Sequence, residues 1–285
     1  MSNAIIVLGM HRSGTSLLAE IIYRWGAYAG DPEDLIQAGQ WNERGHWEFK
    51  PLVLLNSTLL ASLDSDWCLP PAEGSDSILQ SRASEAWFKT NASSLISDME
   101  LRGGPWLWKD PRLCILLPFW KQLLDATYVI SVRNPAEVAT SLLKRNGMPT
   151  SAALLLWQYY MLSLLANTKG TARKIFIQYD ALVARSHEEF NRLINFLDTH
   201  CGGNGTSQQK LRHMIGAVAP ELNHSGPEAV HCCQLTSEQK KLQSALKQRL
   251  SDDALDHVVK GCSLYPGWRE YLEVCYVLHQ VKVMR

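Results

Sequence analysis

Short runs of apolar residues alternate along the chain with longer segments in which apolar residues recur at helical spacing. Four runs are predicted to be strands, at residues 4–8, 106–108, 127–132 and 174–178. Most are continuous rather than alternating, which is typical of parallel strands buried on both faces. Helical spacing follows the first run, where Gly26 suits a helix end, and recurs at 135–145 and 151–167. The alternation predicts an α/β fold, a three-layer α/β/α arrangement with a central parallel sheet.

The length of 285 residues allows one large domain or two small ones, at roughly 100–200 residues per domain. We expect a single domain over residues 1–285, with its core motifs within 4–182. Residues 64–76 and 201–207 are predicted loops. Residues 208–285 are expected to form a mainly helical C-terminal part that packs on the same domain.

Charge and hydropathy exclude some partners. The formal net charge is zero, so the overall charge favours neither nucleic acid nor an anionic membrane, and any anion site must be local. The apolar stretch at 152–166 is shorter than the roughly 20 residues that a membrane span needs. The N-terminus lacks the pattern of a secretion signal. We therefore expect a soluble cytoplasmic protein without a membrane span or a nucleic-acid partner, and the oligomeric state is not indicated.

The seven cysteines include no C-x-x-C pair. Their number is odd and small for a disulfide-built fold of this size, so we expect reduced thiols, mostly in the core. The cluster His231-Cys232-Cys233 lacks the ligand spacing of a zinc site. We expect no metal.

Gly9 and Gly14 frame the loop that follows the first predicted strand. Glycine permits the tight turns that aim consecutive N–H groups at an anion, and the start of the next helix adds unpaired N–H groups and its dipole. Ser13, Thr15 and Ser16 add hydroxyl donors. We predict a nucleotide site like that of P-loop proteins; the alternative is an ordinary strand–helix turn.

The loop lacks the lysine of a nucleoside triphosphate site. In G-x-x-x-x-G-K-[ST] that lysine reaches the terminal phosphates, and Thr15 occupies its position here. The run Arg12-Ser13-Gly14-Thr15-Ser16 instead resembles the 5′-phosphosulfate loop of sulfotransferases, especially their carbohydrate-directed and bacterial members. The resemblance implies that these residues bind the donor 3′-phosphoadenosine 5′-phosphosulfate (PAPS). It also implies a catalytic role for Arg12, at the bridging or leaving-group oxygen.

A second resemblance concerns the site for the donor's 3′-phosphate. In sulfotransferases an arginine closes a strand and a serine follows eight residues later, as Arg133 and Ser141 do here. The resemblance implies that both bind the donor. Asn134 also suits a helix N-cap and Glu137 a capping box, which sets Arg133 at the carboxyl end of a strand, where α/β folds bind ligands. The alternative is a surface arginine beside a capped helix.

Residues 42–48 supply the candidate base. They resemble a bacterial sulfotransferase segment of the form N-x-x-G-[FY]-[FW]-E, which implies Glu48 as the catalytic base and His46 as the second choice. A structural salt bridge of Glu48 is the alternative. His224 is a more remote candidate.

Two further segments, 109–112 and 178–182, resemble sulfotransferase segments that follow strands. Asp110 and Arg112 either pair with each other or turn a charge toward the acceptor. Asp180 is predicted to cap the next helix. The R-K-G-x-x-G-x-W-K segment with which cytosolic sulfotransferases cover the nucleotide is absent from the sequence.

These features predict a PAPS-dependent sulfotransferase acting on a hydroxyl (or amine) of a glycan, lipid or small metabolite. Trp41, Trp47 and Trp67 fall in loop-like segments, where packing is the more common role and stacking on a sugar the less common one. One alternative is a kinase or other phosphotransferase with a degenerate loop, which predicts dependence on ATP and magnesium. Another is a non-catalytic module that binds a nucleotide or a partner, which predicts donor binding without transfer.

Overall fold

The computed structural model describes residues 3–40, 42–72, 75–203, 208–218 and 233–283. Within them, four parallel strands form one sheet in the order β2-β1-β3-β4. The strands are β1 (Ala4–Leu8), β2 (Trp106–Lys109), β3 (Thr127–Val132) and β4 (Lys174–Gln178). All four predicted strands are confirmed, and β2 runs one residue further than predicted.

Strand β1 explains why the sequence pattern is continuous rather than alternating. It pairs with β2 on one side and β3 on the other, and all of its residues are buried. Successive side chains of a strand point to opposite faces. Ile5 and Val7 therefore join one hydrophobic core, and Ala4, Ile6 and Leu8 join the other. A strand buried on both faces requires apolar residues at every position.

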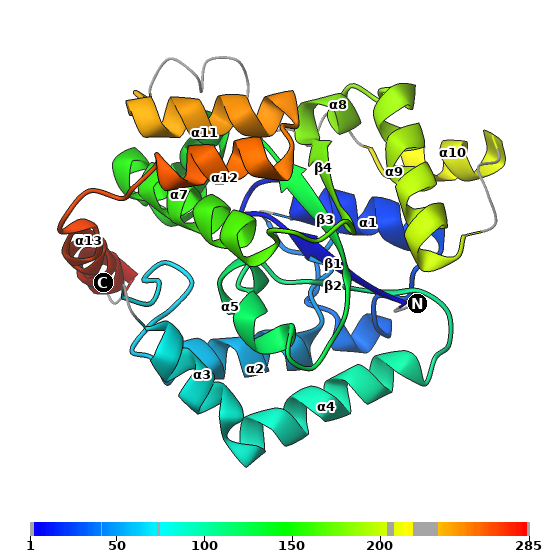
Figure 1. Ribbon diagram of the computed structural model, residues 1–285, viewed down its shortest axis with the longest axis horizontal. Helices are drawn as coiled ribbons and strands as arrows, with labels where there is room; N and C mark the ends of the chain where they lie inside the picture. Colours follow the sequence, from blue (N-terminus) through cyan, green and yellow to red (C-terminus); the bar gives the residue numbers. More distant parts are fainter. Residues whose placement is uncertain (1–2, 41, 73–74, 204–207, 219–232, 284–285) are drawn as a thin grey trace.

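Helices cover both faces of the sheet, which confirms the three-layer arrangement (Figure 1). The first core lies between the sheet and α1 (Thr15–Trp25), α8 (Tyr179–Val183), α9 (His187–Cys201) and α10 (Gln208–Ile215). The second core lies between the sheet and α5 (Leu113–Trp120), α6 (Pro135–Asn146) and α7 (Thr150–Asn167).

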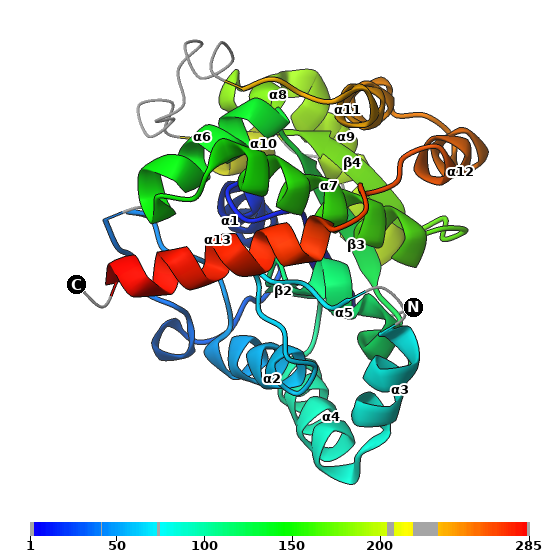
Figure 2. The same ribbon diagram turned by 90° about the vertical axis from the view of Figure 1, so that its left-hand side faces the viewer.

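The remaining helices extend the second core (Figure 2). Three of them and a short 3-10 helix precede β2: η1 (Pro32–Asp34), α2 (Lys50–Ala61), α3 (Asp76–Ser84) and α4 (Ala86–Glu100). Three others pack on α7: α11 (Ser237–Gln248), α12 (Asp252–Lys260) and α13 (Trp268–Val283). That these helices and the sheet form one domain stays a prediction.

Two local predictions are wrong. Asp180 lies inside the first turn of α8, whose N-cap is Gln178, so its side chain caps no helix. Asn134 does cap α6, but the carboxylate of Glu137 pairs with Arg133 instead of closing a capping box. The guanidinium attracts the carboxylate more strongly than a neutral backbone N–H, because both partners are charged.

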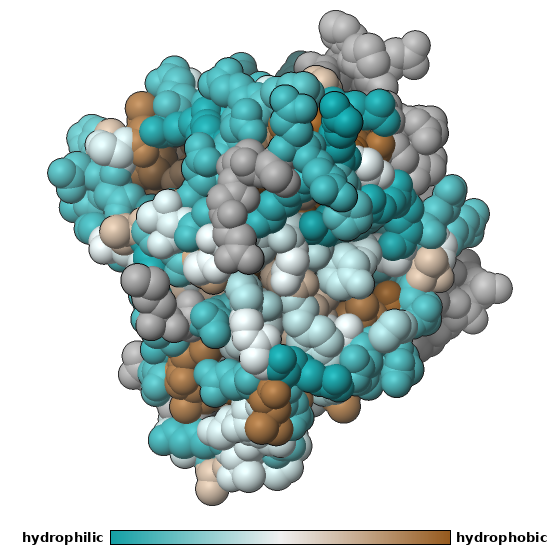
Figure 3. All heavy atoms as spheres, turned by 90° about the vertical axis from the view of Figure 1, so that its right-hand side faces the viewer, coloured by the Kyte–Doolittle hydropathy of each residue, from teal (hydrophilic) through white to brown (hydrophobic). Residues whose placement is uncertain are grey.

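The described part of the chain also bears on membrane, metal and thiol expectations. None of its helices has the length and apolarity to cross a membrane. It contains no group of three or more metal-ligating side chains, whereas His231 and Cys232 lie outside it. Its cysteines are free thiols, and most are buried. The molecular face on the side of α9 and α10 is mostly hydrophilic, with scattered apolar residues (Figure 3).

Candidate functional site

A cavity of about 390 Å³ lies at the carboxyl ends of the four strands. Each strand contributes to its lining through a residue at or after its end, namely Arg12, Lys109, Arg133 and Tyr179. This is the edge at which parallel α/β sheets bind ligands. The structure brings eight of the nine predicted site residues to the cavity: Arg12, Gly14, Thr15, Ser16, His46, Glu48, Arg133 and Ser141. The ninth, Ser13, is a buried residue of the loop, and its hydroxyl has no hydrogen-bond partner among the described residues.

The loop between β1 and α1 depends on glycine at one position above all. Gly14 has φ +83°, and a Cβ atom there would lie 2.1 Å from the ring of Tyr179. Both the left-handed backbone and the close ring exclude a side chain. Arg12 also has a positive φ, of 67°, so the loop turns sharply before α1 begins.

Side chains at the end of strand β3 anchor this loop by binding two of the loop's carbonyl groups. The Ser131 hydroxyl donates to the Ser13 carbonyl at 2.6 Å, and Arg133 Nη1 donates to the Arg12 carbonyl at 2.9 Å. In a trans peptide the C=O and the next N–H point in opposite directions, so the anchored Ser13 carbonyl turns the Gly14 N–H away from β3. Helix α1 has no side-chain cap, and its first N–H groups have no partners within the helix. They are therefore available to an anion.

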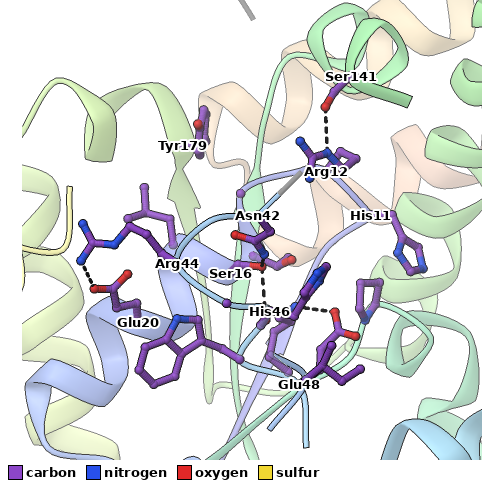
Figure 4. A pocket seen from close by; sticks show the side chains of 18 of the residues that line it. His11, Arg12, Ser16, Glu20, Asn42, Arg44, His46, Glu48, Ser141 and Tyr179 are labelled. Carbon is purple, nitrogen blue, oxygen red and sulfur yellow. Dashed lines mark hydrogen bonds and ion pairs between the residues drawn. The ribbon is translucent and has the colours of Figure 1, made fainter. Parts of the chain in front are cut away.

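The two predicted halves of the donor site contact each other. Arg12 Nε donates a hydrogen bond to Ser141 Oγ at 2.8 Å (Figure 4). Burial lowers the pKa of Arg12 to about 10, and the neighbouring Arg145 and Arg133 add to the effect. Arg12 is still charged at neutral pH. The guanidinium of Arg133 pairs with Glu137 at 3.0 Å and lies 4.2 Å from the ring centroid of Tyr179.

Residues 42–48 close one side of the cavity against the start of α1. Asn42 Nδ2 donates to Ser16 Oγ, and Ser16 Oγ donates to the His46 carbonyl at 3.2 Å. Arg44 forms an ion pair with Glu20, a buried carboxylate on α1. These contacts fix the segment that carries both candidate bases.

The candidate bases differ in their surroundings. Glu48 accepts a hydrogen bond from Lys109 Nζ at 2.5 Å, and both side chains are almost fully buried. The predicted structural salt bridge therefore exists, but the carboxylate also lines the cavity. Burial lowers the pKa of His46, although Glu48 opposes the shift. The imidazole is thus neutral at pH 7 and able to accept a proton.

Asp110 and Arg112 pair with each other at 3.0 Å, which is one of the two arrangements predicted for them. Asp110 is fully buried and also accepts a hydrogen bond from Asn56 at 2.9 Å. Arg112 lines the cavity as well. The ion pair thus connects Asn56 in the core, through Asp110, to Arg112 at the cavity wall.

Some lining residues were missed, or given only a structural role, by sequence reasoning. Trp67 was expected to pack, and Tyr179, Lys109 and Arg145 were not singled out, although two of them stand in the segments 109–112 and 178–182. The signal that could have identified Tyr179 is its position directly after a strand, which it shares with Arg133. The other candidates Trp41 and His224 lie outside the described residues.

Comparisons with known proteins bear on the family and on the fold of the chain. A model of the sulfotransferase family matches residues 4–201, which is more than half of the chain. The chain therefore belongs to the sulfotransferase family.

Among solved structures, the sulfotransferase domain from the Synechococcus PCC 7002 olefin synthase is similar, with a TM-score of 0.52 and 18% sequence identity. The alignment covers 87% of this chain and 94% of that domain. At this identity the likeness establishes the fold. No curated protein sequence gives a significant match.

We predict that buried His11 makes the protein less stable in mild acid. Burial lowers its pKa well below the usual 6.5, and Arg112 and Arg145 reinforce the shift. Because the unfolded chain binds this proton more readily, the free energy of unfolding should fall as the pH drops below about 6.5. Urea titrations at pH 7.5 and 5.5 should give a smaller loss for His11→Gln than for the unmodified protein. His257→Gln, a change at an exposed position, should keep the full loss, and identical losses in all three proteins would contradict the prediction.

Proposed function

We propose that this protein transfers the sulfuryl group of PAPS to a hydroxyl (or amine) acceptor. The observation that carries the proposal is that Arg12 of the β1–α1 loop contacts Ser141, and that both residues line one cavity together with Arg133. The β1–α1 loop suits a phosphosulfate, and Arg133 with Ser141 suits a separate phosphate. PAPS carries both anions, whereas ATP carries a single chain of phosphates. Thr15, at the position of the P-loop lysine, also argues against ATP.

The residues fit each part of the donor. The open N–H groups of Gly14 and α1, with the hydroxyls of Thr15 and Ser16, would hold the 5′-phosphosulfate. The planar guanidinium of Arg133 and the hydroxyl of Ser141 would hold the 3′-phosphate.

The nucleoside would occupy the end of the cavity near Tyr179. The cavity lining includes apolar side chains that could contact the nucleoside, among them Leu17, Val183, Ala217 and Val218. The ring of Tyr179 already stacks on a guanidinium, and its flat surface suits a purine equally well. Glu20 and Arg44 lie on the same side in Figure 4, with polar groups for the purine edge.

The reaction would be an in-line displacement at sulfur. The acceptor oxygen forms a bond to sulfur while the bond from sulfur to the 5′-phosphate oxygen breaks, and the acceptor proton passes to a base. Arg12 and the loop amides would neutralise the charge on the departing phosphate oxygen. This arrangement assigns charge stabilisation to the protein's own groups and needs no metal.

Glu48 is the proposed base, with His46 as the second choice. Lys109 pairs with Glu48 and holds its carboxylate at the cavity wall. Figure 4 places His46 and Glu48 on the side of the site away from Tyr179. An acceptor on that side would approach the sulfur opposite the leaving nucleotide.

The donor assignment is tested with adenosine 3′,5′-bisphosphate, the product nucleotide, in a calorimetric titration. We expect it to bind more tightly than ATP with magnesium. Arg133→Ala should weaken bisphosphate binding by roughly 10²-fold or more, because it removes a charged partner from a buried phosphate. Arg82→Ala, which removes an exposed arginine on α3, is the matched control and should bind as the unmodified protein does. A preference for ATP, or indifference to the 3′-phosphate, would refute the proposal.

The base assignment predicts a loss of turnover without a loss of donor binding. With an acceptor found by screening hydroxyl compounds against labelled PAPS, Glu48→Gln should lower kcat by roughly 10²- to 10⁴-fold. Its affinity for the bisphosphate should change little. Glu33→Gln, at an exposed carboxylate earlier in the chain, is the control. A larger loss from His46→Gln than from Glu48→Gln would move the role to His46.

A further inference from the structure

The cavity end farthest from Tyr179 contains a cation that the proposed reaction does not use. Arg145 lies in the last turn of α6, and its guanidinium turns into the cavity instead of toward solvent. Its Cζ atom lies 5.6 Å from the ring centroid of Trp67. The ring of His11 lies 4.6 Å from the same tryptophan ring. We call these three side chains the Trp67 end.

Most cations around the cavity have a carboxylate partner, whereas Arg145 has none in the part of the chain that the structure describes. The ion pairs are Arg44 with Glu20, Lys109 with Glu48, Arg112 with Asp110 and Arg133 with Glu137. Among the described residues Arg145 forms no ion pair, and its side-chain hydrogen bond goes to the neutral amide of Asn146, at 2.5 Å. The dipole at the end of α6 favours a cation there but does not explain why the guanidinium faces a cavity.

A second group at the Trp67 end has a polar atom that is not used. The Nε2 atom of His11 is buried and makes no hydrogen bond to any described residue. The ring is neutral at pH 7, because burial and the surrounding cations lower its pKa. A neutral imidazole nitrogen without a partner is a position that a ligand's polar atom can fill.

The structure holds the tryptophan in place before any ligand arrives. The Trp67 carbonyl accepts a hydrogen bond from Tyr160 at 2.7 Å. Arg269 of α13 donates to the carbonyls of Pro70 and Asp64 on either side. A fixed platform costs a ligand less ordering than a mobile one.

We infer that the Trp67 end binds the acceptor, and that the acceptor carries an anionic oxygen group, such as a carboxylate, which Arg145 holds. The inference rests on the proposed function and names the acceptor class for the same site. An arginine fork matches the two oxygens of a carboxylate, and the Trp67 face takes the adjoining apolar part. The donor has its own cations, since Arg12 adjoins the phosphosulfate loop and Arg133 the 3′-phosphate. Arg145 lies one helical turn beyond Ser141 along α6, beside Trp67.

The test measures binding to the protein already saturated with adenosine 3′,5′-bisphosphate. The probes are 4-hydroxybenzoate and its methyl ester, which differ in the carboxylate charge. We expect the acid to bind at least roughly tenfold more tightly than the ester, because the ester removes the charged partner of a partly desolvated arginine. Arg145→Gln should abolish that preference and leave bisphosphate affinity unchanged. Lys144→Gln, which removes the adjacent exposed cation of the same helix, should keep it.

Each failure has its own meaning. Equal binding of acid and ester, or no binding of the acid at millimolar concentration, would overturn the inference while donor binding still stands. If Arg145→Gln weakens bisphosphate binding as Arg133→Ala does, Arg145 belongs to the donor site and the inference is wrong. Failure of the bisphosphate itself to bind would count against the proposed function instead.

Discussion

The site depends on the attachment of the β1–α1 loop to the end of β3. Two carbonyls of the loop, those of Arg12 and Ser13, accept hydrogen bonds from Arg133 and Ser131. These bonds aim the next N–H groups and the start of α1 at the cavity, and they bring Arg12 within 2.8 Å of Ser141. Arg133 therefore has two structural positions at once, since it supports the loop and also lines the cavity. A change at this residue would therefore alter both proposed anion subsites at once.

Much of the fold was predictable because the strands are buried on both faces. Such strands appear in the sequence as continuous apolar runs, and three of the four were predicted with the observed bounds. The helices α2, α3 and α4 gave weaker signals. Helix α2 has apolar residues all round, and exposed Leu54 breaks any simple stripe. Asp180 was misjudged because a capping preference cannot reveal that the N-cap lies two residues earlier, at Gln178.

The parts of the candidate site that come from one short segment could be predicted from the sequence. The parts that depend on contacts between distant segments could not. Gly14 and Arg12 stand in one loop, so their spacing in the sequence already describes their geometry. Glu48 and Lys109 are far apart in the chain, and the fold brings the carboxylate and the ammonium group within 2.5 Å of each other. Trp67 and Arg145 likewise come from different segments, and the guanidinium lies against the tryptophan ring. No sequence spacing indicates such pairs, so both were found in the structure.

The most direct test of the account is a crystal structure of the complex with adenosine 3′,5′-bisphosphate. The account predicts that the 3′-phosphate contacts Arg133 and Ser141, that the 5′-phosphate contacts the N–H groups at the start of α1, and that the purine lies against Tyr179. It also predicts that Arg12 Nε leaves Ser141, because both groups acquire an anionic partner. A nucleotide bound elsewhere, or a 3′-phosphate that contacts neither Arg133 nor Ser141, would contradict the account.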